Sequence, residues 1–245
     1  MSELKRVAIV TGASRGIGAA IARRLAQDGF SVMVNYAGNA EAAQSVAQAI
    51  ESSGGQAIIH QADVADPAAV TRMFDAAETA FGGIDALINN AGVMALAPLS
   101  DVDNQQIDRQ IDINLKGTIH TLKEASNRLR QGGRVVNLST SVVGLKLENY
   151  GVYAATKSAV ETLTAIMAKE MRGRDITVNA VAPGPTATDL FMEGKSAELI
   201  DRMAHMSPLE RLGTPQDIAS VVAFLCGPDS SWVNGQVLRA NGGII

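Results

Sequence analysis

The sequence predicts an α/β fold in which helices cover both faces of a doubly wound parallel sheet. Short β-branched runs alternate with longer alanine-rich stretches along all 245 residues, and this alternation is typical of a parallel sheet with right-handed crossovers. The strand-like runs are continuously apolar, as expected for strands buried on both faces. No linker, repeat or low-complexity segment interrupts the pattern, so we expect residues 1–245 to form a single domain.

Each expected element follows from its local pattern. Residues 7–10 form an apolar strand that leads into a glycine-rich turn, and residues 17–28 repeat apolar positions every four residues until Gly29 ends the helix. Pro67 begins another helix, because a first-turn residue needs no free N–H. The remaining expected helices cover residues 114–130, 152–171 and a segment from about Pro215, and the expected strands cover residues 7–10, 31–35, 57–60, 86–89, 134–138 and 177–181.

Bulk composition argues against several classes of protein. The chain has 21 Lys and Arg against 25 Asp and Glu, a formal net charge of −4, which does not suit a nucleic-acid binder that must neutralise phosphates. With one cysteine, Cys226, no disulfide forms within the chain, and the three histidines lack metal-ligand spacing, so we expect no metal site. The apolar run at 7–10 is too short for a signal peptide or membrane span, so we expect a cytoplasmic protein without membrane contact.

The first expected strand leads directly into a turn and a helix with the sequence Thr11-Gly12-Ala13-Ser14-Arg15-Gly16-Ile17-Gly18. Glycines allow positive φ and let the backbone approach a ligand closely. A helix N-terminus adds unpaired N–H groups and the positive end of the helix dipole. Together these features predict a site for a pyrophosphate group, and the alternative is a glycine-rich turn that binds nothing.

The spacing Thr-Gly-x-x-x-Gly-x-Gly resembles that of the short-chain dehydrogenase/reductase family, in its branch of about 250 residues. Further family motifs follow in order along nearly the whole chain. The resemblance implies a Rossmann-like oxidoreductase similar to 3-oxoacyl-carrier-protein reductases. The matching pieces are Asp63-Val64, Asn89-Asn90-Ala91-Gly92, Asn114, Ser141, Tyr153-Ala154-Ala155-Thr156-Lys157, Pro183-Gly184 and Asn234-Gly235.

Tyr153 and Lys157 lie four residues apart in an expected helix, so their side chains share one face. A free phenol has a pKa near 10 and is a poor base at neutral pH. A nearby ammonium group favours phenolate and lowers that pKa, which suits acid/base catalysis. Tyr150 has Ala154 at the same spacing and lacks such a partner. The resemblance implies that Tyr153 donates the proton and that Lys157 tunes its pKa and contacts a ribose; an ordinary surface pair is the alternative.

A hydroxyl group after the fifth strand is expected to orient the substrate. Ser141 lies 12 residues before Tyr153, and its hydroxyl can stabilise the charge that develops on a carbonyl oxygen. The family more often shows 13 residues, so Ser139 and Thr140 remain alternatives, although Ser141 matches best. The resemblance places Asn114 at a helix irregularity, where it holds a water that relays protons to Lys157; a solvated helical asparagine is the alternative.

The second expected strand ends without an acidic residue, in Val34-Asn35-Tyr36-Ala37. A carboxylate there binds the ribose hydroxyl of NAD and would repel a 2′-phosphate. Arg15 can bind such a phosphate as a charged donor, unless it is simply a solvent-facing cation. We therefore predict NADP(H).

The resemblance adds further cofactor contacts. It places Asp63 and Val64 beside the adenine, Asn90 and Gly92 along the adenosine, and Thr188 beside the nicotinamide, although Asp63 could instead cap the helix that Pro67 begins. The full predicted set of cofactor contacts is Gly12, Ser14, Arg15, Gly16, Ile17, Gly18, Asn35, Tyr36, Asp63, Val64, Asn90, Gly92, Tyr153, Lys157, Pro183, Gly184 and Thr188.

Residues 189–208 are expected to form a mobile lid over the substrate, as the resemblance implies. Flexible apolar side chains suit an adaptable pocket, although methionines at helical spacing are more often ordinary core. A carrier protein as substrate would need a basic docking patch. The candidates for the pocket are Leu190, Phe191, Met192, Met203 and Met206, and those for a docking patch are Arg128, Arg130 and Arg174.

Taken together, the sequence predicts an NADPH-dependent reductase that transfers hydride between a nicotinamide and a ketone or 3-oxoacyl substrate, with Tyr153 as proton donor. The alternative is a non-enzymatic NADP(H) sensor of the same fold, which would have no need of Tyr153 and Lys157. An enoyl reductase of related fold would space the tyrosine and lysine more widely. The helices at 114–130 and 152–171 form subunit interfaces in relatives, so the resemblance also implies a homotetramer.

Overall fold

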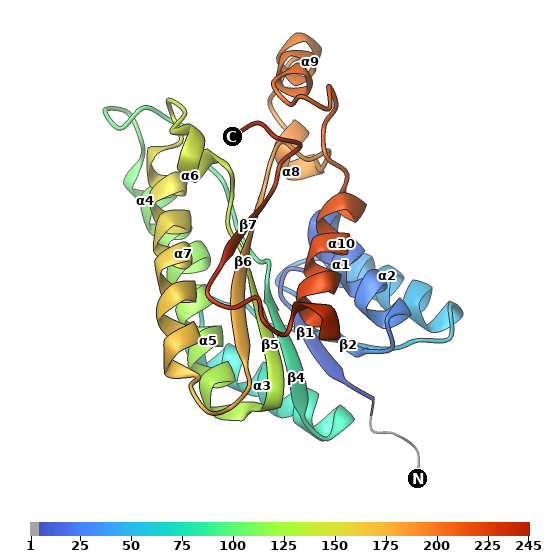
Figure 1. Ribbon diagram of the computed structural model, residues 1–245. Helices are drawn as coiled ribbons and strands as arrows, with labels where there is room; N and C mark the ends of the chain where they lie inside the picture. The colour runs from blue at the N-terminus through green and yellow to red at the C-terminus, as the bar shows by residue number, and fades with distance from the viewer. Residues whose placement is uncertain (1–4) are drawn as a thin grey trace.

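The computed structural model describes residues 5–245. Its centre is a seven-stranded parallel sheet with the order β3-β2-β1-β4-β5-β6-β7 (Figure 1). The predicted doubly wound α/β fold is therefore confirmed. The strands are β1 (Val7–Val10), β2 (Ser31–Tyr36), β3 (Gln56–Gln61), β4 (Ile84–Asn89), β5 (Leu129–Leu138), β6 (Thr177–Pro183) and β7 (Val237–Ala240).

Helices follow the strands and lie on both faces of the sheet. Two non-α segments accompany them, a π-helical segment (Ile111–Lys116) and a 3₁₀ turn (Pro228–Ser230). The α-helices are α1 (Gly16–Gln27), α2 (Ala40–Ser52), α3 (Pro67–Phe81), α4 (Asn104–Gln110), α5 (Gly117–Arg128), α6 (Val142–Leu145), α7 (Gly151–Glu170), α8 (Asp189–Met192), α9 (Ala197–His205) and α10 (Pro215–Cys226).

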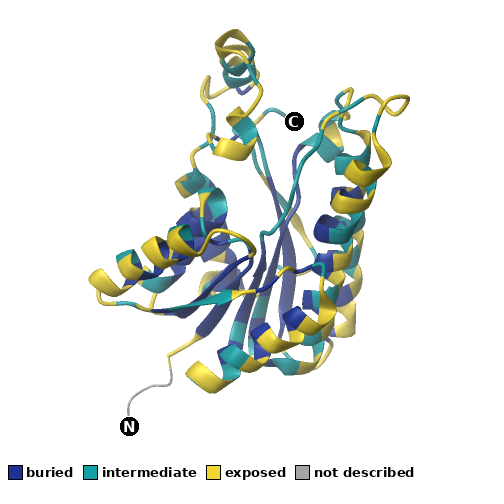
Figure 2. Ribbon diagram, turned by 180° about the vertical axis from the view of Figure 1, so that it is seen from behind, coloured by how far each residue is buried: buried dark blue, intermediate teal, exposed yellow. Residues whose placement is uncertain are grey.

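Two hydrophobic cores hold the helices to the sheet. On one face α1, α2 and α10 pack through side chains such as Ile21, Leu25 and Val222. On the other face α3, α5 and α7 pack through side chains such as Phe74 and Met167. The central strands between them are buried, whereas the outer sides of the helices are exposed (Figure 2). Burial on both faces explains the continuous apolar runs in the sequence.

Several helices begin where the sequence places a capping residue. Asp66 accepts a hydrogen bond from the Ala68 N–H and precedes Pro67, the first residue of α3, so the predicted start is confirmed. Asp63, which was the alternative cap, instead accepts from the Ala65 N–H at 3.0 Å. Side-chain oxygens at such positions satisfy N–H groups that the helix itself leaves free.

The structure differs from the expected elements in several places. β7 was not predicted, because only alternate residues of this edge strand are partly buried and Arg239 interrupts its apolar pattern. β5 begins five residues before the expected start at Arg134. The expected helix from Asn114 is divided into the π-helical segment and α5, and residues 189–208 contain two short helices.

The strand order places the functional end of the sheet. From β1 the chain adds β2 and β3 on one side and then crosses to add β4 on the other. The carboxyl ends of β1 and β4 therefore flank a crevice, which is where open α/β sheets bind ligands. Within residues 5–245 no helix is long and apolar enough to pass through a bilayer.

Candidate active site

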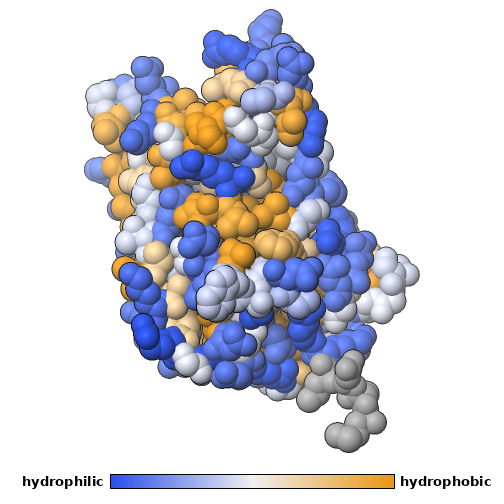
Figure 3. Space-filling model, in the orientation of Figure 1, coloured by the Kyte–Doolittle hydropathy of each residue, from blue (hydrophilic) through white to orange (hydrophobic). Residues whose placement is uncertain are grey.

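A cavity of about 620 Å³ opens at the carboxyl ends of the strands. All the residues predicted to contact the cofactor line this cavity, and so does Ser141. Asn114 is the one predicted catalytic or cofactor-binding residue that does not line it. Apolar surface gathers in the hollow between the α6 side of the molecule and the α8–α9 segment (Figure 3). A volume of this size and a mixed polar and apolar lining are typical of a small-molecule site.

The glycine-rich turn after β1 forms a close backbone cradle at the N-terminus of α1. Gly12 and Gly16 have φ values of 61° and 56°, a region that glycine enters at little cost. A Cβ at Gly12 would lie 2.9 Å from the Cα of Ala91, and one at Gly18 would collide with Gly12 O and the Asn90 amide. The turn is thus shaped for glycine and presents N–H groups suited to the pyrophosphate of a dinucleotide.

Two asparagines, Asn35, which is buried, and Asn90, which is partly buried, hold this turn in place. The Asn35 Oδ1 accepts from the Gly12 N–H at 3.1 Å, and its amide donates to the carbonyls of His60 and Ala62. The Asn90 amide donates to the carbonyls of Thr11 and Gly12 at 2.9 and 3.0 Å. Both side chains line the cavity, so the predicted cofactor contact stays a prediction, and these hydrogen bonds show that they also support the cradle.

The end of β2 carries no carboxylate toward the cavity. Tyr36 is buried, and Ala37, Gly38 and Asn39 after it also line the cavity. Asn39 caps α2 by accepting from the Ala42 N–H. Arg15 is exposed at the rim and also lines the cavity. The prediction missed residues 37–39, although a Gly-Asn turn directly before a helix was a signal for such a site.

Tyr153 and Lys157 lie on the face of α7 that lines the cavity. The predicted lowering of the phenol pKa by Lys157 is wrong in this structure. Desolvation, with a smaller contribution from Tyr150, raises the pKa of Tyr153 to about 12, and a hydrogen bond with the Thr140 side chain opposes this shift. The Lys157 ammonium donates to the Leu138 carbonyl at 2.7 Å, and burial lowers its own pKa to about 8.

Two of the three hydroxyl groups that follow β5, those of Thr140 and Ser141, point in different directions. The Ser141 Oγ donates to the Ala182 carbonyl at 3.1 Å and accepts from the Asn241 amide at 3.0 Å, and the residue is 2% exposed. The Thr140 hydroxyl accepts from the Val142 N–H at 3.3 Å and lies close enough to the Tyr153 phenol to lower its pKa. The preferred prediction of Ser141 as the orienting hydroxyl does not agree with this geometry, whereas the alternative Thr140 does, at the 13-residue spacing.

Asn114 lies in the π-helical segment and is fully buried. Its Oδ1 accepts from the Val93 N–H at 2.8 Å, and its Nδ2 donates to the Val93 carbonyl at 2.9 Å and to the Thr156 hydroxyl at 3.3 Å. A Cβ at Gly92 would lie 3.3 Å from the Asn114 Oδ1 and 3.6 Å from the Lys157 Nζ. The helix irregularity that the resemblance implied is present, and the side chain joins it to the segment after β4.

The segment from β6 to α10 covers one side of the cavity. Thr188 caps α8 by accepting from the Phe191 N–H, and its side chain lies next to Gly16. Asp189, Leu190, Phe191, Met203 and Met206 line the cavity. Met192, which was also a candidate, points outward and is 39% exposed. Over residues 189–208 the structure therefore supplies an apolar wall beside the nucleotide cradle.

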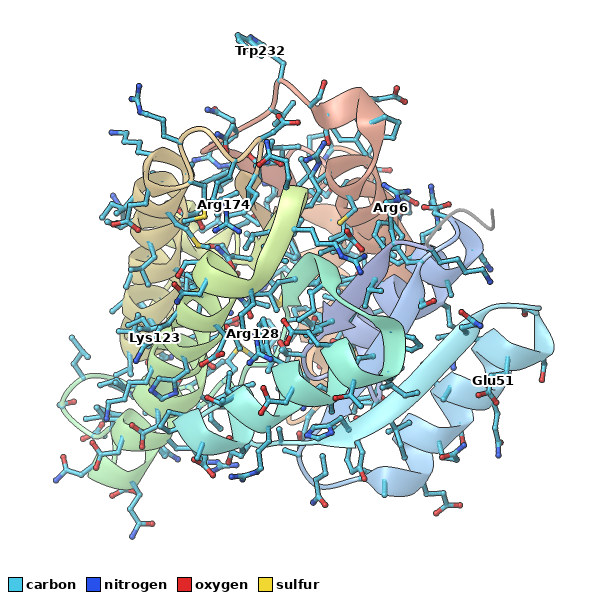
Figure 4. The ribbon with its side chains drawn as sticks, turned by 90° about the horizontal axis from the view of Figure 1, so that it is seen from below. Arg6, Glu51, Lys123, Arg128, Arg174 and Trp232 are labelled. Atoms are coloured by element: carbon cyan, nitrogen blue, oxygen red, sulfur yellow. The ribbon has the colours of Figure 1, made fainter. Side chains whose placement is uncertain are left out.

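The three arginines considered as a docking patch are bound within the protein. Arg128 pairs with Asp75, Glu78 and Glu124. Arg130 pairs with Asp85, and Arg174 donates to the carbonyls of Ser126 and Leu129. Figure 4, seen from the amino ends of the strands, labels Arg128 and Arg174 on the side of the molecule away from the cavity. This arrangement contradicts a docking role beside the site.

The site contains the chemistry of a nucleotide cradle and a proton donor. In the part of the chain that the structure describes, no three His, Cys, Asp or Glu side chains are grouped to hold a metal ion. The cradle, the phenol and the buried ammonium all lie around one cavity. Such an arrangement suits proton transfer to a carbonyl oxygen next to a bound dinucleotide.

Comparisons with known proteins agree with this arrangement. A family model described as "Enoyl-(Acyl carrier protein) reductase" matches residues 12–245. A short-chain type dehydrogenase/reductase of Picea abies is 45% identical over 97% of this chain and 92% of its own length. An NADPH-dependent aldehyde reductase-like protein of Arabidopsis thaliana, described as chloroplastic, is 43% identical over 98% of this chain and 94% of its own.

A solved structure extends the likeness to three dimensions. It is a short-chain dehydrogenase of Burkholderia cenocepacia in complex with NADP, which is 39% identical, with a TM-score of 0.92 over 99% of both chains. At this identity and coverage both the fold and the order of the motifs are shared. The chain therefore belongs to the short-chain dehydrogenase/reductase family.

Proposed function

We propose that this protein reduces the carbonyl group of a ketone or 3-oxoacyl compound with NADPH. The chain is an NADP(H)-dependent oxidoreductase acting on carbonyl and alcohol groups, on the basis of its family and of the nucleotide named for its relatives. The observation that carries the proposal is that Tyr153, Thr140 and Lys157 line the same cavity as the glycine cradle.

The cradle and the residues after β2 are suited to NADP(H). Backbone N–H groups of the Gly12–Gly18 turn would hold the pyrophosphate, and Asp63 and Val64 would lie beside the adenine. Arg15 and the Ala37–Asn39 turn would take the 2′-phosphate, because no carboxylate at the end of β2 repels it. Pro183, Gly184 and Thr188 form the wall on the other side.

The residues around the phenol perform the proton chemistry. NADPH, when bound, supplies the hydride that reduces the carbonyl carbon. Tyr153 donates its proton to the carbonyl oxygen, and Thr140 donates a hydrogen bond that orients this oxygen, in the role first assigned to Ser141. Lys157 holds the Leu138 carbonyl, and we assign it the ribose contact as well. Asn114 positions the Val93 segment; the water relay to Lys157 stays a prediction.

The substrate end of the cavity favours apolar compounds. Leu190, Phe191, Met203 and Met206 line it, and methionine side chains adapt to irregular apolar shapes. We assign residues 189–208 the role of a lid over this end. A carrier-protein substrate is less well supported than a free ketone, because the arginines considered for docking are engaged elsewhere.

A non-enzymatic NADP(H) sensor is the weaker alternative. A sensor needs the cradle but has no use for a buried lysine beside a cavity-lining phenol, and burying an ammonium is costly. Lys157 is 4% exposed and directs its Nζ to the end of β5. The presence of this costly arrangement supports an enzymatic function over a sensor.

Turnover with a panel of carbonyl compounds tests the proposal. Purified protein is incubated with NADPH, apolar ketones, aldehydes and an acetoacetyl thioester, and loss of NADPH absorbance is followed. Tyr153→Phe is expected to lower kcat by about a thousandfold or more and to leave NADPH affinity unchanged. Tyr150→Phe, in the same cavity, is expected to keep kcat within about tenfold. NADPH binding without turnover of any carbonyl would favour the sensor.

Nucleotide preference provides a separate test. Ala37→Asp places a carboxylate at the exposed end of β2, where it would repel a 2′-phosphate. We expect KM for NADPH to rise at least about tenfold, while KM for NADH stays the same or falls. Ala37→Asn is the uncharged control. A wild-type protein that prefers NADH would overturn the assignment of Arg15 and residues 37–39.

A homotetramer is proposed as the assembly, with α5 and α7 at the subunit contacts. Ile119 on α5 is 41% exposed and Ile166 on α7 is 47% exposed, and exposed apolar side chains on neighbouring helices are typical of an interface. A cytoplasmic location stays a prediction.

A further inference from the structure

Three successive turns of α7 contact three successive residues at the end of β5. Tyr153, Lys157 and Glu161 are spaced by four residues, so they share one face of the helix. Thr140 lies close enough to the Tyr153 phenol to lower its pKa. The Lys157 Nζ donates to the Leu138 carbonyl at 2.7 Å.

The third contact joins Glu161 to Ser139. The Ser139 Oγ donates to the Glu161 Oε1 at 2.6 Å, a short distance typical of a hydrogen bond to a carboxylate. Ser139 is 4% exposed and lines the cavity between Leu138 and Thr140. Its backbone N–H donates to the Val181 carbonyl at 2.7 Å, so the main chain is also tied to β6.

We propose that Ser139 and Glu161 form a positioning pair, which sets the end of β5 against α7 so that the Leu138 carbonyl meets Lys157 and the Thr140 hydroxyl meets Tyr153. Neither member of the pair is assigned a part in proton or hydride transfer. The inference rests on the proposed roles of Tyr153, Lys157 and Thr140 in carbonyl reduction.

The geometry explains why this segment needs an additional contact to fix its orientation. The backbone changes direction after β5, and α6 begins at Val142, within three residues of Ser139. A side chain in such a short turn is free to point in more than one direction. A charge-assisted hydrogen bond on the buried side fixes the orientation, and misplacing reacting groups by a fraction of their contact distance lowers the rate of the chemical step.

The experiment removes each partner and then both. In Ser139→Ala and Glu161→Ala, we expect kcat for a ketone to fall about tenfold, while KM for the ketone and Kd for NADPH stay within about twofold, because the nucleotide cradle belongs to β1 and α1. The double variant should lose no more than either single one. Glu161→Gln keeps an oxygen acceptor and Ser139→Thr keeps a donor, so both are expected to restore most of the activity.

A pair of the same chemistry away from the cavity provides the control. The Thr71 hydroxyl on α3 donates to the Glu124 Oε1 on α5 at 3.0 Å, and neither residue lines the cavity. Thr71 is exposed, so Thr71→Ala should lower Tm no more than Ser139→Ala, and it should leave kcat unchanged. An equal loss of kcat in both variants would mean general destabilisation and would overturn the proposal.

The remaining outcomes are also decisive. Wild-type kcat in Ser139→Ala, or losses that multiply in the double variant, would show that the pair does not position the site. If Glu161→Gln is as inactive as Glu161→Ala, activity depends on the charge of Glu161 rather than on its hydrogen bond to Ser139. That result would also overturn the proposal. An active Tyr153→Phe would instead refute the underlying function, so the two failures are distinguishable.

Discussion

Burial moves the two titrating groups of α7 in opposite directions. It raises the pKa of the Tyr153 phenol to about 12 and lowers the pKa of the Lys157 ammonium to about 8. Both shifts favour the uncharged form, because a charge loses its hydration in the cavity wall. The phenol therefore keeps its proton at neutral pH, as a proton donor to a carbonyl requires. This conclusion differs from the sequence prediction, in which Lys157 makes the phenol more acidic.

The depressed pKa of Lys157 predicts a pH effect on stability. Between about pH 8 and 10.5 the unfolded chain binds the lysine proton and the folded chain does not, so stability rises with pH across this window. Relative to Lys157→Met, which does not titrate, the wild type should gain about 3 kcal/mol from pH 8 to 10.5. Urea unfolding at both pH values measures the difference. If the free energies of unfolding of the wild type and of Lys157→Met change equally with pH, the lowered pKa of Lys157 is contradicted.

The direction of the hydroxyls after β5 predicts different effects for neighbouring residues. Thr140→Ala is expected to lower kcat about a hundredfold, because it removes a donor to the developing oxyanion, and Thr140→Ser should retain activity. Ser141→Ala should keep kcat within severalfold but cost about 1 kcal/mol of stability, because the Ala182 carbonyl and the Asn241 amide lose their partner. Steady-state kinetics and urea unfolding of both variants test this prediction. The reverse result would favour Ser141 as the hydroxyl that orients the substrate.

At the scale of elements, regular helices and buried strands are the parts that the sequence predicts well. The four-residue repeat of Ile17, Ile21 and Leu25 indicates α1, and the structure ends α1 within a residue of the expected position. β7 was missed because its pattern is that of a half-exposed edge, where alternation with Arg239 resembles a loop. Periodicity did not indicate the π-helical segment, because an extra residue per turn leaves no mark on a short apolar pattern, and only the family resemblance implied an irregularity at Asn114.

The π-helical segment itself predicts a result for Asn114→Ala. The variant leaves the partly buried N–H and carbonyl of Val93 without their partner, which costs about 1–3 kcal/mol of stability. We also expect a lower kcat, because Val93 follows Gly92 at the cavity wall. Asn127→Ala, an exposed asparagine on α5, is the matched control and should change stability by no more than about 0.5 kcal/mol. Equal stability of both variants would contradict the prediction.

At the scale of the whole molecule, two hydrophobic cores fix the sheet, and the site lies where its strand order reverses. The helices of the Phe74 and Met167 core also present Ile119 and Ile166 outward. The same helices therefore hold the catalytic face toward the cavity and an apolar face toward solvent. A partner subunit on that outer face would further restrict the movement of α7.

Assembly through these helices is testable. Ile166→Glu places a charge on the exposed face of α7, and its burial in a subunit interface would be costly. We expect sedimentation to show a tetramer for the wild type and smaller species for the variant. Met192→Glu, at a similarly exposed residue of α8, is the control and should not change the mass. A monomeric wild type would contradict the proposed assembly.

The sequence by itself determined the α/β order, the glycine cradle, the absence of a carboxylate after β2 and the pairing of Tyr153 with Lys157. These are properties of neighbouring residues, and local periodicity and spacing record them. Only the tertiary structure decided that Thr140 rather than Ser141 faces the phenol, that Asn35 and Asn90 serve the cradle, and that burial sets both pKa values. The reason is that side-chain direction and desolvation depend on residues distant in the chain, such as Ala182 and Asn241 around Ser141.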